Sequence, residues 1–227
     1  MFDRFDPTDR IHFLNLAAVM EGSLIVIAFV CGWLAEAQPL HSLQWQWDAL
    51  VWGVVGTVPL FGLFLLSYRF PIGPLFKIKR FLVEMLGPSL VACRWYDLVL
   101  LALLAGFSEE LLFRGVLQPW FGQGKFGSSE FLIGLIGSNI LFGLAHTVTP
   151  TYAILAALVG VYLGVLRQAT GSPNLIAPMV THGLYDYFAF LVVAHTYRSE
   201  QSIESHQELP EEDQDDPGRK NEGNVKK

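Results

Sequence analysis

Three short patterns in the second half of the sequence place ionisable side chains inside long apolar segments. They are Glu109-Glu110-Leu-Leu-Phe-Arg114, Phe142-Gly-Leu-Ala-His146 and His182-Gly-Leu-Tyr-Asp186. A carboxylate and an imidazole that share one water molecule can remove its proton while it attacks a carbonyl carbon, which is general-base hydrolysis. A charge at the centre of a bilayer costs about 2.5–3.5 kcal/mol on insertion scales. We therefore expect these groups to meet around a polar cavity.

Helical spacing divides the first pattern into two roles. Glu110 and Arg114 are four residues apart with the acid first, the order that favours a side-chain ion pair. We therefore predict a structural pair there. Glu109 points about 100° around the helix from Glu110 and lacks such a partner, so it is available for chemistry.

The other two patterns supply the imidazoles. Phe142 and His146 share a helix face, so we expect the aromatic ring to pack on the imidazole and restrict its orientation, and His182 and Asp186 share a face in the same way. Each has an ordinary structural explanation when taken alone. His146 could bond a loop carbonyl at the interface, and His182 with Asp186 could lock the last helix. Independent placement of all these groups at membrane depth is improbable, so together they favour a site.

Apolar runs long enough to cross a bilayer must position these residues, at about 20 residues per crossing. Six such runs lie near 14–36, 48–68, 97–118, 129–148, 151–168 and 174–196. Residues 75–92 mix bases with apolar residues at helical spacing, which predicts an interfacial helix, with a shallow re-entrant insertion as the alternative. The chain has 227 residues, 52% hydrophobic and 16% charged, as is typical of polytopic membrane proteins. We predict an all-α, polytopic transmembrane helix bundle of about six spans.

The basic residues of the predicted loops set the orientation. With the N-terminus inside, the inner loops hold eight bases and the outer loops two, Lys125 and Arg167. The eight are Arg4, Arg10, Arg69, Lys77, Lys79, Arg80, Arg94 and Arg198. Both termini are therefore expected in the cytoplasm. This topology brings the three patterns together in the inner leaflet, in an active-site cavity open to cytosolic water.

The sequence divides into an apolar part and a polar tail. Residues 1–197 form the predicted transmembrane domain, with a motif-bearing core at 97–196. Residues 198–227 carry nine acidic and five basic side chains and too little apolar surface to fold, so we expect disorder. The basic residues form no stripe suited to nucleic acid, and no nucleic-acid partner is expected.

Small residues recur on the fifth predicted span. Ala156, Gly160 and Gly164 are four residues apart, which predicts close helix packing inside the bundle, with self-association as the alternative. Cys31 and Cys93 are too few for a disulfide framework and show no metal-ligand spacing. We expect both to be small apolar packing residues.

The ordered set Glu-Glu-x-x-x-Arg, Phe-x-x-x-His and His-x-x-x-Asn/Asp, each on its own predicted membrane helix, resembles the CPBP family of intramembrane proteases. That family includes the CAAX-processing Ras-converting endopeptidases and the bacterial abortive-infection and bacteriocin-immunity type proteins. The resemblance covers about 97–196 and implies an intramembrane glutamic endopeptidase with an all-α membrane fold and a cavity reached from the cytosol. It further implies that Glu109 and His146 activate the water, while His182 and Asp186 stabilise the oxyanion.

One position departs from the family pattern. Many members, including the CAAX-processing enzymes, have Asn where this chain has Asp186. An Asn can donate a hydrogen bond to an oxyanion, whereas an ionised Asp cannot. Asp186 must then be protonated, orient His182 or bind a cation.

Other functions fit part of the same pattern. Intramembrane Glu, His and Asp also serve proton relays, so a proton-coupled transporter is one alternative, although no inverted repeat is evident. A catalytically silent membrane scaffold or immunity protein is another. The four groups would also make a zinc site of nitrogen and oxygen ligands, but there is no His-Glu-x-x-His helix, and we expect a mechanism without metal or other cofactor. The expected partners are the lipid bilayer and a membrane-associated peptide or protein substrate, and the expected location is a bacterial inner membrane.

Overall fold

The structure, a computed structural model, describes residues 6, 8–123 and 130–207, which form helices joined by turns and loops, with no strand among them. The elements are α1 (Arg10–Leu34), α2 (Trp47–Arg69), α3 (Pro74–Phe81), η1 (Leu82–Leu86), α4 (Gly87–Ala92), α5 (Trp95–Glu110), η2 (Leu111–Leu117), α6 (Gln118–Phe121), α7 (Glu130–Ala145), α8 (Pro150–Leu166) and α9 (Ile176–Gln207). The predicted all-α fold class is confirmed. Lys125, which was assigned to an outer loop, lies outside the described residues.

The third predicted span contains an irregularity that periodicity did not predict. The helix winds without a break from Trp95 to Phe121, but its middle segment, η2, is a π-helix. The segment η2 begins directly after Glu109 and Glu110. Short π segments inside α-helices often lie at functional sites, because they change which residues share a face.

The distribution of polar and apolar side chains is that of a protein surrounded by lipid. Trp33 and Val58 are 79% and 69% exposed, whereas the side chains of Glu110 and Arg114 are 0% exposed. Among the described residues, three helices are long and apolar enough to cross a membrane: α1, α2 and the Ile176–Ile203 part of α9. The helices α7 and α8 are apolar but shorter.

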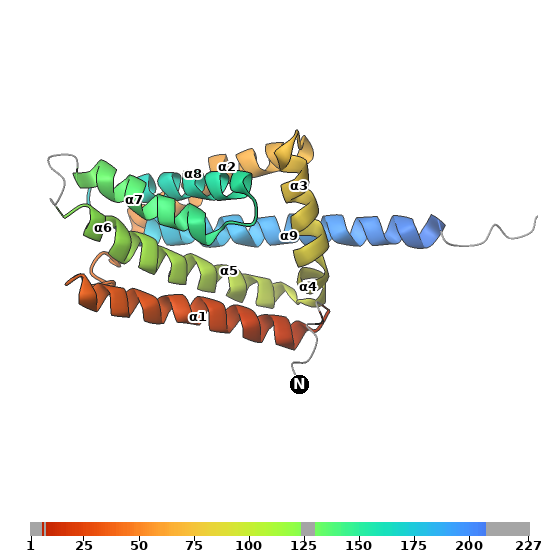
Figure 1. The fold of residues 1–227 in the computed structure, drawn as a ribbon, viewed down its shortest axis with the longest axis horizontal. Helices are drawn as coiled ribbons and strands as arrows, with labels where there is room; N and C mark the ends of the chain where they lie inside the picture. Colours follow the sequence, from red (N-terminus) through yellow and green to blue (C-terminus); the bar gives the residue numbers. More distant parts are fainter. Residues whose placement is uncertain (1–5, 7, 124–129, 208–227) are drawn as a thin grey trace, which may run out of the picture.

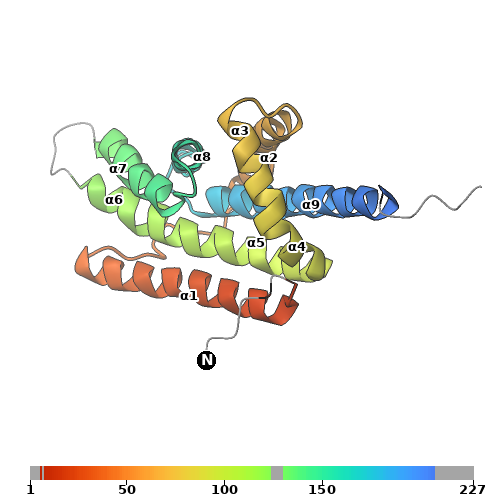
Figure 2. The same cartoon turned by 45° about the vertical axis from the view of Figure 1, so that its right-hand side comes forward.

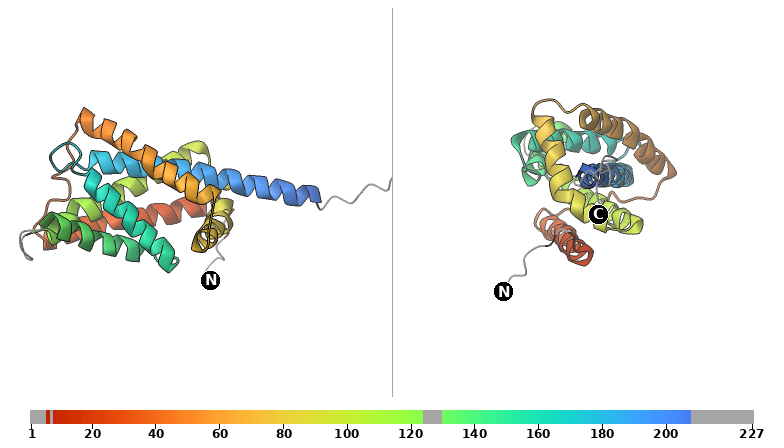
Figure 3. Two further views of the ribbon diagram at one scale, coloured as in Figure 1. Left: turned by 90° about the horizontal axis from the view of Figure 1, so that it is seen from above. Right: turned by 90° about the vertical axis from the view of Figure 1, so that its right-hand side faces the viewer.

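The long helices run roughly along one axis, and α3 crosses one end of the bundle (Figure 1). Figure 2 shows the same crossing after a rotation, with α3 between the ends of α2 and α4. The first turn of α1 and the last turns of α9 lie at this end (Figures 1 and 3). At this end of the bundle, the Arg10 side chain of α1 donates two hydrogen bonds to the Asp97 carboxylate of α5, at 2.6 and 2.7 Å. Exposed Trp95 marks this end and exposed Trp33 the opposite one, as aromatic belts do at membrane interfaces.

Glycines allow the helices that carry the three patterns to pack closely. A Cβ on Gly106 of α5 would lie 2.9 Å from the backbone nitrogen of Gly183 of α9. This crossing brings the acidic pair of α5 beside the His182 pattern. On α8, Gly160 faces the side chains of Asn139 and Arg114, so the predicted packing role of the small residues is confirmed.

The last helix is longer than predicted. It continues to Gln207, so residues 198–207, which were expected to be disordered, are helical, and that boundary was wrong. The packed part of α9 supplies the helix nucleus, and adding a residue to an existing helix is far easier than starting one. Residues 208–227, the rest of the expected disordered tail, lie outside the described residues.

The two cysteines pack as small apolar residues. Cys93 belongs to the core cluster around Tyr68 and Leu98, and Cys31 packs against the cluster around Leu111. Burial raises the pKa of the Cys93 thiol to about 11, so this thiol is protonated at neutral pH.

Candidate active site

Arg114 and Glu110 form a fully buried ion pair that connects three helices. The Nη1 of Arg114 donates to Glu110 Oε1 at 2.8 Å. Its Nη2 donates to Asn139 Oδ1 of α7 at 3.0 Å and to the carbonyl oxygen of Gly160 of α8 at 2.8 Å. The guanidinium also lies 4.6 Å from the ring centroid of Phe142. This group, which we call the Arg114 clamp, therefore holds η2 against α7 and α8.

Glu110 also orients the imidazole of His182. The spacing of these residues in the sequence did not predict this contact. His182 Nδ1 donates to Glu110 Oε1 at 2.9 Å. A ring that donates from Nδ1 directs Nε2 the other way, and here Nε2 lies 3.4 Å from Asp186 Oδ2 and 3.9 Å from Glu109 Oε2. The clamp thus extends from the structural pair into the candidate site.

Glu109 lies between the two imidazoles, and its Oε2 accepts no hydrogen bond from a described residue. Its Oε2 is 3.7 Å from His146 Nε2 and 3.9 Å from His182 Nε2, longer than a direct hydrogen bond of about 2.7–3.2 Å. That oxygen is buried, and no described residue hydrogen-bonds to it. The structure therefore brings Glu109, His146, His182 and Asp186 together, and it leaves Glu109 Oε2 without a hydrogen bond from a described residue.

His146 is held in one orientation by its own helix end. Its Nδ1 donates to the carbonyl oxygen of Phe142 at 2.8 Å, so Nε2 faces Glu109. The Phe142 ring lies against the imidazole, with centroids 4.4 Å apart and planes tilted by 30°. The packing predicted from their shared helix face is present. The neutral ring then carries its lone pair at Nε2, where a proton could be accepted.

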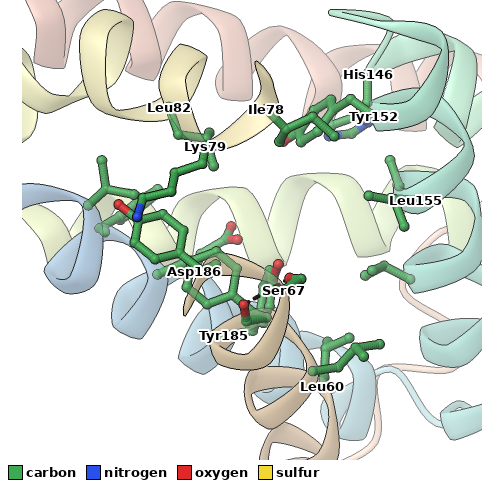
Figure 4. A pocket seen from close by; sticks show the side chains of 18 of the residues that line it. Leu60, Ser67, Ile78, Lys79, Leu82, His146, Tyr152, Leu155, Tyr185 and Asp186 are labelled. Atoms are coloured by element: carbon green, nitrogen blue, oxygen red, sulfur yellow. Dashed lines mark hydrogen bonds between the residues drawn. The ribbon is translucent and has the colours of Figure 1, made fainter. Parts of the chain in front are cut away.

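A cavity of about 230 Å³ opens beside these groups. Its polar lining includes His146, His182, Asp186, Tyr152 and Tyr185. Figure 4 shows His146 and Tyr152 on one side of the cavity, and Asp186 and Tyr185 closer to its middle. Most of its wall is apolar and comes from α2, α3, η1, α8 and α9. A few polar groups in an otherwise apolar cavity are the usual form of a site that binds an organic substrate.

The sequence did not predict every residue of this site. Tyr152, Tyr185 and Lys79 line the cavity, and only the position of Tyr185 next to Asp186 gave a signal. Glu21 of α1 faces the bundle, where Ser108 Oγ of α5 donates to its Oε2 at 2.6 Å. In the described part of the chain, no group of three or more His, Cys, Asp or Glu side chains is arranged to hold a metal ion.

One comparison with known proteins gives a match. Residues 90–188 match a family model described as type II CAAX prenyl endopeptidase Rce1-like, and this segment includes all three patterns. The match is consistent with the CPBP family. No curated protein matches the chain, and no solved structure matches it. The matched family is one of proteases, and three helices of the described part of the chain are long and apolar enough to cross a membrane.

Proposed function

We propose that this chain, a member of the CPBP family by its Rce1-like residues 90–188, is an intramembrane endopeptidase that hydrolyses peptide bonds near the cytosolic face of the membrane. One observation carries the proposal: Glu109 Oε2, which is buried and has no described hydrogen-bond donor, lies 3.7 Å from His146 Nε2. A water molecule beside Glu109 Oε2 and His146 Nε2 would contact both groups.

The first step is attack by that water. Glu109 and His146 Nε2 together accept one proton from the water as its oxygen bonds to the carbonyl carbon of the substrate. The carbonyl π electrons move to oxygen and form an oxyanion. The Phe142 carbonyl fixes His146 from the other side of the ring, so the lone pair at Nε2 stays directed at the reacting water.

The second step breaks the peptide bond. The oxyanion returns its electron pair to carbon, the C–N bond breaks, and the proton taken from water passes to the leaving nitrogen. The products are a carboxylic acid and an amine, and the base is restored. His182 Nε2, protonated and aimed by its bond to Glu110, is the proposed donor to the oxyanion, and a protonated Asp186 is the second.

Helix lengths support a site in the inner leaflet. The helices α7 and α8 contain 16 and 17 residues, which span about 24–26 Å at 1.5 Å per residue. This is shorter than a bilayer core of about 30 Å. The turn between them carries His146 and is directed toward the end where α3 crosses (Figure 1). Six spans, an interfacial α3 and cytoplasmic termini would place this turn below the cytosolic surface of a bacterial inner membrane.

The family description names the class of substrate with which to begin. A CAAX prenyl endopeptidase acts on peptides that carry a prenylated cysteine near the C-terminus, and such peptides are the first probes for this chain. The natural substrate is best found by comparing membrane proteomes of source cells with and without the gene, each rescued with the wild-type or the Glu109→Gln protein.

The proposal predicts that at least one uncleaved membrane-associated protein accumulates without the gene and is processed again only with the wild-type protein. Equal rescue by the two proteins would contradict the proposal and support a scaffold or immunity protein. Flux of protons or solutes through liposomes containing the wild-type protein, with no change in the proteome, would support a transporter instead.

A further inference from the structure

The cavity contains one basic side chain that the proposed mechanism does not use. Lys79 of α3 is the one Lys or Arg among the described residues that line the cavity. Lys77, on the same short helix, is exposed and does not line it. Figure 4 shows Lys79 entering the cavity on the opposite side from His146 and Tyr152. The cavity therefore has a positive charge on the side that lies away from His146.

The charge of Lys79 has no acidic partner in the described part of the chain. None of the ion pairs there includes Lys79, whereas the adjacent Arg80 pairs with Glu84. Its ammonium group instead lies 4.7 Å from the centroid of the Tyr68 ring. A cation–π contact fixes the position of the ammonium but leaves its N–H groups free to donate to an anion.

We propose that Lys79 binds a carboxylate of the peptide substrate and so fixes the direction in which the peptide enters the cavity. The proposal rests on the proposed endopeptidase function. A carboxylate is attracted by Lys79 and repelled by the carboxylate of Glu109, so the peptide lies with its anionic end at α3 and its scissile carbonyl at His146. The residues between these ends contact the apolar wall that Leu60, Leu82 and Leu155 help to form (Figure 4).

A peptide fits these observations better than a lipid headgroup does. Lys79, His146, His182 and Asp186 line the same cavity, so an occupant beside Lys79 reaches toward the catalytic groups. A hydrolytic site requires a peptide there, and a peptide offers a carboxylate from two sources, its C-terminus or an acidic side chain. A lipid phosphate at Lys79 would occupy the space that the substrate needs.

Binding to a hydrolysis-deficient protein tests the proposal separately from catalysis. The Glu109→Gln protein in phosphatidylcholine nanodiscs is titrated against a fluorescent S-farnesylated peptide that ends in three apolar residues, and binding is followed by fluorescence anisotropy. The peptide is made with a free C-terminal carboxylate and as the C-terminal amide. We expect the free acid to bind about tenfold more tightly, as for one charge-assisted hydrogen bond in a cavity.

Variants on the same helix provide the controls. Lys79→Met, added to the Glu109→Gln protein, removes the preference for the free acid, Lys79→Arg keeps most of it, and Lys77→Met leaves it unchanged. Thermal unfolding of each variant shows that the fold is retained. An amide peptide whose last residue is Asp separates the two sources: tight binding means that any carboxylate suffices, and weak binding means that the chain terminus is required.

Three results would overturn the inference. They are equal binding of acid and amide, a preference that survives Lys79→Met, or no binding of either peptide. A fourth result would also overturn the inference. If phosphatidylglycerol weakens the binding of both peptides, and does so only when Lys79 is present, then Lys79 binds lipid phosphate. Failure of the endopeptidase proposal alone would give a different result: the wild-type protein would bind the free acid with the predicted preference but would cleave no peptide.

Discussion

Glu109 and Glu110 are adjacent in the sequence and have opposite surroundings. Glu110 is fully buried and its Oε1 accepts hydrogen bonds from both Arg114 and His182. Glu109 is 12% exposed and its Oε2 has no described donor, although two imidazoles lie within 4 Å. A charge that serves the fold is paired, because an unpaired buried charge is costly. A charge left without a direct partner beside a cavity is available to a substrate and its water.

The two environments depend on each other. His182 is bonded to Glu110 on one side of its ring and faces Glu109 on the other. The Arg114 clamp therefore sets the position of a ring that belongs to the proposed catalytic group. Substitutions in the clamp should lower the stability of the fold and, as a consequence, the activity. Substitutions at Glu109 should affect activity alone.

Removing the clamp cation gives the largest expected loss of stability. Arg114→Gln leaves Glu110 buried without its cation, and we expect the free energy of unfolding to fall by about 3–5 kcal/mol. Thermal and denaturant unfolding in detergent measure this loss. The double variant Glu110→Gln with Arg114→Gln removes both members of the pair and should be no less stable than Arg114→Gln alone. If the stability losses of the single variants Arg114→Gln and Glu110→Gln add up to the loss of the double variant, the pair does not act as a unit.

Separating α5 from α9 should damage both environments together. A Cβ added by Gly106→Ala would lie 2.9 Å from Met179 O as well as from Gly183 N, so the helices must move apart. We expect a loss of about 1–3 kcal/mol in stability and a lower kcat/KM. Gly62→Ala on α2 is the matched control, because nothing lies within 4 Å of its added Cβ. Similar behaviour of the two variants would argue against the close crossing.

Asp186 should tolerate one substitution and not another. Asp186→Asn supplies an amide donor to the oxyanion, so kcat/KM should stay within about tenfold of the wild type, whereas Asp186→Ala removes the donor and should lower it about 100-fold. Steady-state kinetics on the same peptide compares them. Equal losses in the two variants would mean that Asp186 acts through its negative charge.

The smallest expected effect is that of metal removal. Prolonged treatment with a strong chelator, followed by dialysis, should leave peptide cleavage unchanged, because the proposed water is activated by Glu109 and His146 alone. Loss of cleavage that zinc restores would replace this mechanism with a metal-dependent one. The Arg114 clamp would be unaffected in that case.

Local spacing predicted much of this arrangement. The four-residue spacing predicted the contact of Glu110 with Arg114 and of Phe142 with His146, because such neighbours meet within one helix whatever its surroundings. The apolar runs predicted the helices to within a few residues at most ends, as for the run 48–68 and α2 at Trp47–Arg69.

Contacts between helices were not predictable in the same way. The bond from His182 to Glu110 joins residues 72 positions apart and depends on the crossing at Gly106 and Gly183. Lys79 was counted as a loop base, because sequence gives no sign of which base on a short amphipathic helix turns inward. The end of α9 was misplaced because composition indicates a lack of apolar surface but not how far a packed helix extends.

Cleavage by the purified protein tests the central claim most directly. Wild-type, Glu109→Gln and Lys77→Met proteins are placed in proteoliposomes with an internally quenched S-farnesylated peptide, and the products are identified by mass spectrometry. We predict cleavage by the wild-type and Lys77→Met proteins and a loss of at least about 100-fold in Glu109→Gln, with unchanged thermal unfolding. Cleavage by Glu109→Gln at the wild-type rate would contradict the account.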